Sequence, residues 1–225
     1  SPVPARSLAP TPENTRSNLS AAGWLQHAAG RLAPSKTARL EARVLLAHHL
    51  RQPPAWLLAH PEYELSPAIL DKLEADLQRL EAGEPLPYVL GWWEFYGRRF
   101  QVTPDVLIPR PETELLVESA LSWLAAHPEA RLAADAGTGS GCIAVSLAAA
   151  HPDLTVLASD LSLAALRVAR QNARALVPAS RLHFVQADLL AYTDARFDLI
   201  LSNPPYIPRA SLRRLHAAKA EPKAE

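Results

Sequence analysis

The chain has 225 residues, of which 48% are apolar, 20% charged and 6% aromatic, so one large domain or two modest ones can form. Its 23 lysine and arginine residues balance 23 aspartate and glutamate residues, which argues against a polybasic surface for nucleic acid. A single cysteine excludes a disulfide framework and a cysteine-based zinc site, and no apolar run reaches the ~18–20 residues of a membrane span. The proline-rich residues 1–16 lack the pattern of a secretory signal and predict a disordered N-terminal segment in a cytoplasmic protein.

Residues 17–84 carry helical periodicity and predict an N-terminal helical bundle. Ser20 or Asn18 can cap the first helix, and Ser35 precedes the second. Ser66, which stands before a proline, and Gly83 mark the beginning and the end of the last helix. Apolar residues three or four positions apart predict the buried faces: Leu40, Val44, Ala47 and Leu50 in the second helix, and Ile69, Leu73, Leu77 and Leu80 in the last.

Residues 85–110 differ in composition and predict a linker between two domains. Aromatic and β-branched residues are concentrated between positions 89 and 103, around two glycines. Because Gly97-Arg98 can form a turn, this segment predicts a β-hairpin of two short antiparallel strands.

Residues 111–208 alternate between helical and strand patterns. The predicted helices begin at Pro111, cover 141–150 and follow Ser162, and the predicted strands cover 131–135, 154–159, 181–186 and 197–202. Such alternation is typical of a parallel sheet with helices on both faces. We therefore predict an α/β protein, in which an all-α bundle precedes a doubly wound, Rossmann-like domain.

A glycine-rich loop follows the first strand of this domain, at Gly137, Thr138, Gly139, Ser140 and Gly141. Glycines permit a tight turn and let a ligand approach the backbone closely. The spacing departs from the dinucleotide fingerprint, whose last glycine would fall at Cys142, and it lacks the Gly-Lys-Ser/Thr ending of a phosphate-binding loop. No lysine or arginine flanks the loop, so we interpret it as a site for a neutral or cationic nucleoside rather than an ordinary turn.

Acidic residues follow the next two predicted strands, at Asp160 and Asp188. The ends of neighbouring parallel strands face one crevice, so Asp160 can accept hydrogen bonds from both ribose hydroxyls of a nucleoside. Asp188 can accept from the exocyclic amine of adenine, with Leu189 against the ring. The alternatives are a helix N-terminal acid at Asp160 and a turn-forming acid at Asp188.

The segment Asn203-Pro204-Pro205-Tyr206 directly follows the last predicted strand. Two prolines fix the backbone and remove two N–H donors, so carbonyl groups point outward. The side-chain oxygen of Asn203 and the carbonyl of Pro204 can accept both hydrogens of a planar NH2 group, while Tyr206 offers it a flat face. Holding both hydrogens directs the nitrogen lone pair at an electrophile and stabilises the positive charge that develops on nitrogen. The alternative is a rigid loop.

These features together resemble the class I S-adenosylmethionine-dependent methyltransferases that act on planar nitrogen. Within that class, Gly91-Trp92-Trp93-Glu94-Phe95-Tyr96 and Leu107-Ile108-Pro109-Arg110-Pro111-Glu112-Thr113-Glu114 resemble the peptide-chain release factor glutamine methyltransferase family. The resemblance covers roughly residues 18–208, which include the helical bundle.

The resemblance implies a protein-glutamine N5-methyltransferase that uses S-adenosylmethionine. Its substrate would be the glutamine side chain in the Gly-Gly-Gln motif of release factors, which the bundle would help to dock. We expect a monomer with no metal, no membrane partner and no direct nucleic-acid partner. The implied cofactor-binding residues are Gly137, Thr138, Gly139, Ser140, Gly141, Asp160, Asp188, Leu189 and Asn203. The implied catalytic residues are Asn203, Pro204 and Tyr206, and the implied substrate-binding residues are Asn203, Pro204, Pro205, Tyr206, Phe100 and Arg110.

The chain departs from this family after residue 208. The family's sheet has further strands there, whereas residues 209–225 read as a polar tail. We therefore expect a sheet without its last strands and weak binding of the cofactor to this chain. Three alternatives stay open: a ribosomal-protein glutamine methyltransferase, an adenine-N6 DNA methyltransferase, or a truncated inactive module that binds release factor.

Overall fold

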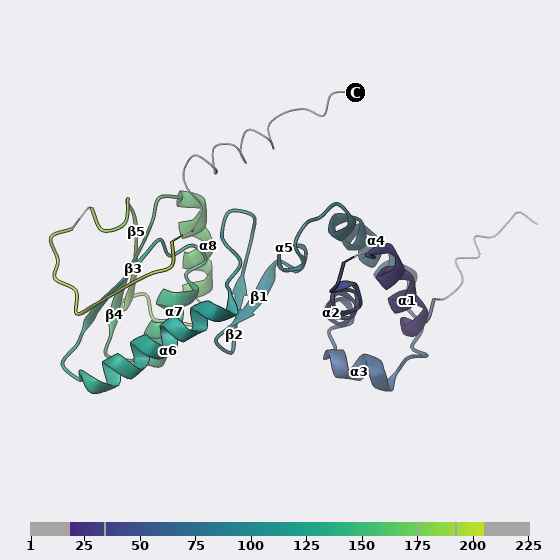
Figure 1. Ribbon diagram of the computed structural model, residues 1–225, viewed down its shortest axis with the longest axis horizontal. Helices are drawn as coiled ribbons and strands as arrows, with labels where there is room; N and C mark the ends of the chain where they lie inside the picture. Colours follow the sequence, from purple (N-terminus) through teal and green to yellow (C-terminus); the bar gives the residue numbers. More distant parts are fainter. Residues whose placement is uncertain (1–18, 34, 175, 192, 205–225) are drawn as a thin grey trace, which may run out of the picture. The chain divides into compact units, whose positions relative to one another are not determined.

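The computed structural model describes residues 19–33, 35–174, 176–191 and 193–204 (Figure 1). The predictions for the N-terminal segment 1–16 and the tail 209–225 lie outside these residues. The chain divides into two compact units between Leu90 and Gly91. This boundary falls within the predicted linker 85–110. None of the described helices is both long enough and apolar enough to cross a bilayer.

The described part of the first unit is helical, as the sequence predicts. Its helices are α1 (Ala21–Arg31), α2 (Ala38–Leu50), α3 (Pro54–Ala59), α4 (Pro67–Glu81) and α5 (Leu86–Leu90). The Ser20 hydroxyl caps α1, because it accepts a hydrogen bond from the Gly23 N–H at 3.2 Å. Gly83 follows α4 with a φ of +85°, a conformation that glycine adopts readily.

The buried faces of these helices match the prediction in α4, but only in part in α2. Of the predicted α4 stripe, Leu73, Leu77 and Leu80 are buried. The predicted α2 stripe is right only in part: Ala47 is buried, but Leu40 is 57% exposed. The helix also buries Ala38, Ala42, Leu45 and Leu46, which the predicted stripe does not include. Apolar residues lie on more than one face of α2, so periodicity alone could not select the face that packs.

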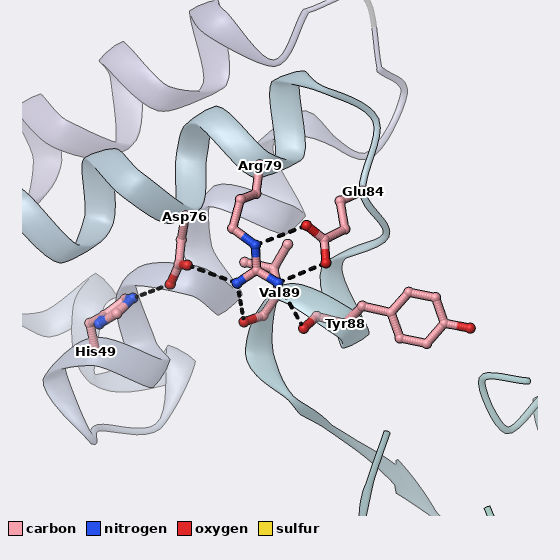
Figure 2. A network of polar contacts seen from close by, with 6 residues as sticks. All are labelled: His49, Asp76, Arg79, Glu84, Tyr88 and Val89. Atoms are coloured by element: carbon pink, nitrogen blue, oxygen red, sulfur yellow. Dashed lines mark hydrogen bonds and ion pairs between the residues drawn. The ribbon is translucent and has the colours of Figure 1, made fainter. Parts of the chain in front are cut away.

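A polar network joins α4 to α2 and α5 (Figure 2). The Arg79 guanidinium donates to both Glu84 carboxylate oxygens at 2.7 and 2.8 Å and to the Asp76 carboxylate at 3.2 Å. It also donates to the carbonyls of Tyr88 and Val89, each at 3.3 Å. On its other side, Asp76 lies 2.8 Å from a ring nitrogen of His49. One side chain thereby fixes where α5 lies against α4.

The second unit begins with the predicted hairpin, formed by β1 (Trp92–Phe95) and β2 (Arg98–Gln101). The turn lies one residue earlier than predicted, because Tyr96 and Gly97 have φ values of +49° and +67°.

A parallel sheet with order β5-β4-β3-β6 follows the hairpin. Its strands are β3 (Leu132–Ala136), β4 (Thr155–Asp160), β5 (Leu182–Gln186) and β6 (Leu199–Ser202), and its helices are α6 (Pro111–Ala126), α7 (Cys142–Ala150) and α8 (Leu163–Arg174). The register pairs Ala136 with both Ser159 and Ser202, so the carboxyl ends of three strands lie side by side. This edge is where parallel α/β sheets bind their ligands.

The core of this unit lies between the sheet and α7. Ala133, Val156 and Leu201 face the same cluster as Val145 of α7 and are buried. The helix α7 is buried from Cys142 to Ala148. This agrees with its sequence, which is apolar and alanine-rich throughout rather than amphipathic.

Candidate functional site

The glycine loop connects β3 to α7 and has two different sides. Gly137, Gly139 and Gly141 all have positive φ, at +78°, +55° and +80°. A Cβ atom built on Gly137 or Gly139 would meet no other atom within 4 Å. A Cβ on Gly141 would lie 3.0 Å from the Cβ of Ala169 in α8. The first two glycines therefore leave open space beside the backbone, whereas the third allows a helix to approach.

The structure brings Asp160 to this loop, as the strand order predicts. One carboxylate oxygen accepts from the Gly139 N–H at 2.8 Å, and the other accepts from the Ser162 N–H at 2.9 Å. Each oxygen has a second lone pair, so the carboxylate is oriented by the backbone and can still accept from a ligand hydroxyl.

Asp135 is a member of the site to which the sequence assigned no role. Its side chain is fully buried. One carboxylate oxygen accepts both from the Thr138 hydroxyl at 2.6 Å and from the Ala144 N–H at 3.2 Å. The other carboxylate oxygen finds no hydrogen-bond partner among the described residues. Burial raises the pKa of Asp135 to about 6. The signal that could have found it is an acid at the end of a strand, two residues before the first glycine.

Asp188 and Leu189 follow β5 and lie at the same carboxyl edge of the sheet as Asp160. The Ala187 N–H donates to the Asp160 carbonyl at 3.1 Å, which places Asp188 one residue from that contact. Both Asp188 and Leu189 are exposed, and Leu189 has a φ of +52°. A leucine in the left-handed region is strained, and such strain is concentrated at functional sites.

The end of β6 lies on the other side of the glycine loop. The Ser202 hydroxyl donates to the carbonyl of Ala136 at 2.7 Å. Ala136 is the residue directly before Gly137, the first glycine of the loop. The Asn203 side-chain amide donates to the Thr113 hydroxyl of α6 at 2.9 Å, which fixes the plane of that amide. Pro204 is exposed, whereas the predicted site residues Pro205 and Tyr206 lie outside the described residues.

The predicted substrate-binding residues Phe100 and Arg110 differ in burial. Phe100 is fully buried and packs edge to face against Phe95, with the ring centroids 6.0 Å apart, so its side chain is not brought to the exposed edge. Its contact with the substrate stays a prediction. Arg110 is exposed at the beginning of α6, and its carbonyl accepts from the Thr113 N–H at 3.0 Å.

No group of acidic, histidine or cysteine side chains among the described residues could hold a metal ion. Burial raises the pKa of the Cys142 thiol to about 12, so the beginning of α7 does not activate it.

Two family profiles match the chain. Residues 23–91 match the PrmC N-terminal domain, and residues 112–218 match the methyltransferase small domain. Among solved structures, the Pyrococcus abyssi tRNA (uracil-54, C5)-methyltransferase in complex with S-adenosyl-L-homocysteine is 19% identical. That likeness has a TM-score of 0.42 and covers 57% of this chain and 32% of the other, which is too little to support any statement about function.

Curated relatives are much more similar. The release factor glutamine methyltransferase of Bordetella pertussis is 49% identical over 79% of this chain and 66% of its own length. That of Cereibacter sphaeroides is 47% identical over 84% of this chain and 67% of its own length. The chain thus spans about two thirds of the length of these relatives. The identity, together with the two matched domains, shows that the chain belongs to the release factor glutamine methyltransferase family.

Proposed function

We propose that this protein transfers a methyl group from S-adenosylmethionine to the glutamine side chain in the Gly-Gly-Gln motif of release factors. The observation that carries the proposal is the position of Asn203. It follows β6, whose register with β3 places it beside the glycine loop, and Thr113 orients its amide. A group that can hold a planar amide thus stands next to a loop that can hold a nucleoside.

The residues of the loop fit the proposed cofactor. Gly137 and Gly139 leave room beside the backbone, and the oriented Asp160 carboxylate can accept from ribose hydroxyls. Asp188 and Leu189 would meet the adenine, and Thr138, Ser140 and Gly141 would complete the loop around the ligand. When bound, S-adenosylmethionine supplies an electrophilic methyl group on a sulfonium.

The chain's own part in the reaction is to prepare the amide nitrogen. Asn203 and the Pro204 carbonyl accept its two hydrogens, which turns the lone pair toward the methyl group. As the new C–N bond forms and the C–S bond breaks, the same acceptors stabilise the positive charge on nitrogen. The proton then leaves to solvent, because an alkylated amide nitrogen is strongly acidic. Tyr206 would cover the planar face of the amide, and Arg110 would lie near the substrate.

The partner is proposed from the relatives, which are named release factor glutamine methyltransferases. We propose a release factor as the protein substrate, docked by the helical bundle, with the enzyme acting as a monomer in the cytoplasm and without nucleic acid.

Radiolabelled methyl transfer tests the function. Purified chain and labelled S-adenosylmethionine are incubated with three substrates: a release factor, ribosomal protein and duplex DNA. We expect label on the release factor, and none on a matched release factor whose motif reads Gly-Gly-Ala. Incorporation only into ribosomal protein or DNA would overturn the choice of substrate. Release factor captured without any methylation would instead support the inactive binding module.

A further inference from the structure

Asn172 of α8 links three segments of the second unit through one buried side chain. Its side-chain oxygen accepts from the Gln101 N–H at 2.7 Å, and its amide nitrogen donates to the Gln101 carbonyl at 3.0 Å. The same nitrogen donates to the Ser140 carbonyl at 2.8 Å. Gln101 is the last residue of β2, and Ser140 lies in the glycine loop. The side chain thus joins the hairpin, the loop and the helix.

The contact with Gln101 imitates a strand partner. A neighbouring strand would offer that residue one acceptor and one donor, and the Asn172 amide offers the same pair. Because the amide is planar, these two bonds fix its orientation. The second hydrogen of its nitrogen then points to Ser140, so the position of β2 determines the direction in which the loop is held.

A separate contact brings α8 against the same loop. Gly141 leaves no space for a side chain, because a Cβ there would lie 3.0 Å from the Cβ and 3.2 Å from the Cα of Ala169. Ala169 and Asn172 are three positions apart and therefore share one face of α8. This face packs on Gly141 through Ala169 and binds Ser140 through Asn172.

We propose that Asn172 is a positioning residue for the cofactor loop and that it couples the β1–β2 hairpin to that loop. The proposal rests on the proposed function, in which the loop binds S-adenosylmethionine. Three residues of the loop, Gly137, Gly139 and Gly141, are glycines with positive φ. Because glycine can adopt many backbone conformations, the loop needs contacts from outside to keep this one. A ligand that needs one loop conformation binds more weakly when that conformation is only partly populated.

Two substitutions separate the contacts. N172A removes all three hydrogen bonds. N172D keeps an acceptor for the Gln101 N–H but turns a carboxylate oxygen toward the carbonyls of Gln101 and Ser140. The matched control is Q171A, which changes the preceding, exposed residue of α8. Backbone amide exchange by NMR reports on Gln101, Gly139 and Gly141, and titration with S-adenosyl-L-homocysteine reports on the loop as a binding site.

We expect N172A to speed amide exchange at Gln101, Gly139 and Gly141 and to weaken ligand binding about tenfold, as for loss of a buried hydrogen bond. N172D should speed exchange in the loop while Gln101 stays protected. Q171A should change neither. A variant N172A that lowers thermal stability but binds the ligand with unchanged affinity would overturn the proposal and leave Asn172 a purely structural residue.

The unsubstituted chain supplies a second test, which needs no variant to fold. If hairpin and loop are coupled, ligand bound at the loop must slow exchange of the Gln101 N–H, because coupling between two sites is reciprocal. Slower exchange at Gly139 and Gly141 with no change at Gln101 would overturn the coupling. If the ligand causes no change anywhere, the proposed cofactor site fails, while the exchange rates of N172A still decide whether Asn172 holds the loop.

Discussion

The two units use polar side chains in opposite ways. In the first unit they are charged, partly exposed and paired with one another: Arg31 pairs with Glu74 and with Glu81, and Arg79 pairs with Asp76 and Glu84. In the second unit they are buried or half-buried and mostly bind backbone groups, as Asp135, Asp160 and Asn172 do.

Because of this difference, loss of a polar side chain should have different consequences in the two units. Exposed ion pairs contribute little free energy each, and salt screens them, so the bundle can lose one and keep its fold. A buried carboxylate or amide that binds a loop backbone fixes the loop conformation, and its loss changes what the loop can bind. Removing a polar group that holds the loop in the second unit should therefore also affect ligand binding or catalysis, whereas removing an ion pair in the first unit should lower stability only slightly.

The largest effect is expected from N203A. Loss of the group proposed to hold the substrate amide should lower kcat for methyl transfer about 10²–10³-fold, as for loss of a transition-state hydrogen-bond partner. T113V, which removes only the acceptor that orients Asn203, should lower kcat less. Steady-state kinetics with release factor measure both. Equal rates for N203A and the unsubstituted chain would remove Asn203 from the mechanism.

Next in size is the contrast between two glycines of the loop. G141A should destabilise the second unit by about 3–4 kcal/mol, because it adds both backbone strain and a clash with Ala169. G137A should cost only about 1 kcal/mol of strain, yet its methyl group would occupy the open space proposed for the ligand. Urea denaturation and ligand titration of both variants separate fold from binding. Similar stability losses in the two variants would contradict the distinction.

A smaller effect, dependent on pH, is expected from D135N. Because the pKa of Asp135 is raised from 3.8 to about 6, the folded state binds more protons than the unfolded state between these values. Stability from this group is therefore highest below about pH 4, falls by on the order of 3 kcal/mol as the pH rises to about 6, and is level above that pH. Asparagine does not titrate, so the difference in unfolding free energy between the two proteins should follow this curve. A difference that is constant from pH 4 to 7 would contradict it.

The smallest effect is expected from R79A in the bundle. Removing its exposed ion pairs should lower the stability of the first unit by about 1 kcal/mol, and less in 1 M salt. Arg79 also lowers the pKa of Glu84 below its usual value, so this stabilisation is present at neutral pH and is lost as the pH falls through that lowered pKa. Thermal unfolding at two salt concentrations measures it. Ligand titration should give the same affinity as the unsubstituted chain.

The sequence predicted most of the fold because its signals were local. Ser20 caps α1, proline begins α4 and α6, and the alternating elements of the second unit fall within one or two residues of their predicted positions. The α2 face was predicted only in part, because the face that packs depends on tertiary contacts. The hairpin turn was predicted one residue too late, because its position depends on the backbone angles of Tyr96 and Gly97.

The site was predicted in part for the same reason. Motifs adjacent in sequence gave Gly139, Asp160 and Asn203, and the strand order brings these together. The orienting roles of Thr113 and Asn172 were missed, since these residues lie 90 and 32 residues from the groups they orient. Thr113 stands in the segment 107–114 that carries the family resemblance, but nothing in that segment indicates a contact with Asn203, and Asn172 belongs to no motif.

The most direct test of the central claim is a titration of the isotope-labelled chain with S-adenosyl-L-homocysteine, followed by NMR. We expect saturable shifts of the Gly137–Gly141, Asp160 and Leu189 amides, with a midpoint above the micromolar range, and loss of these shifts in D160A. Shifts confined to the helical bundle, or unchanged shifts in D160A, would contradict a cofactor site built on the glycine loop.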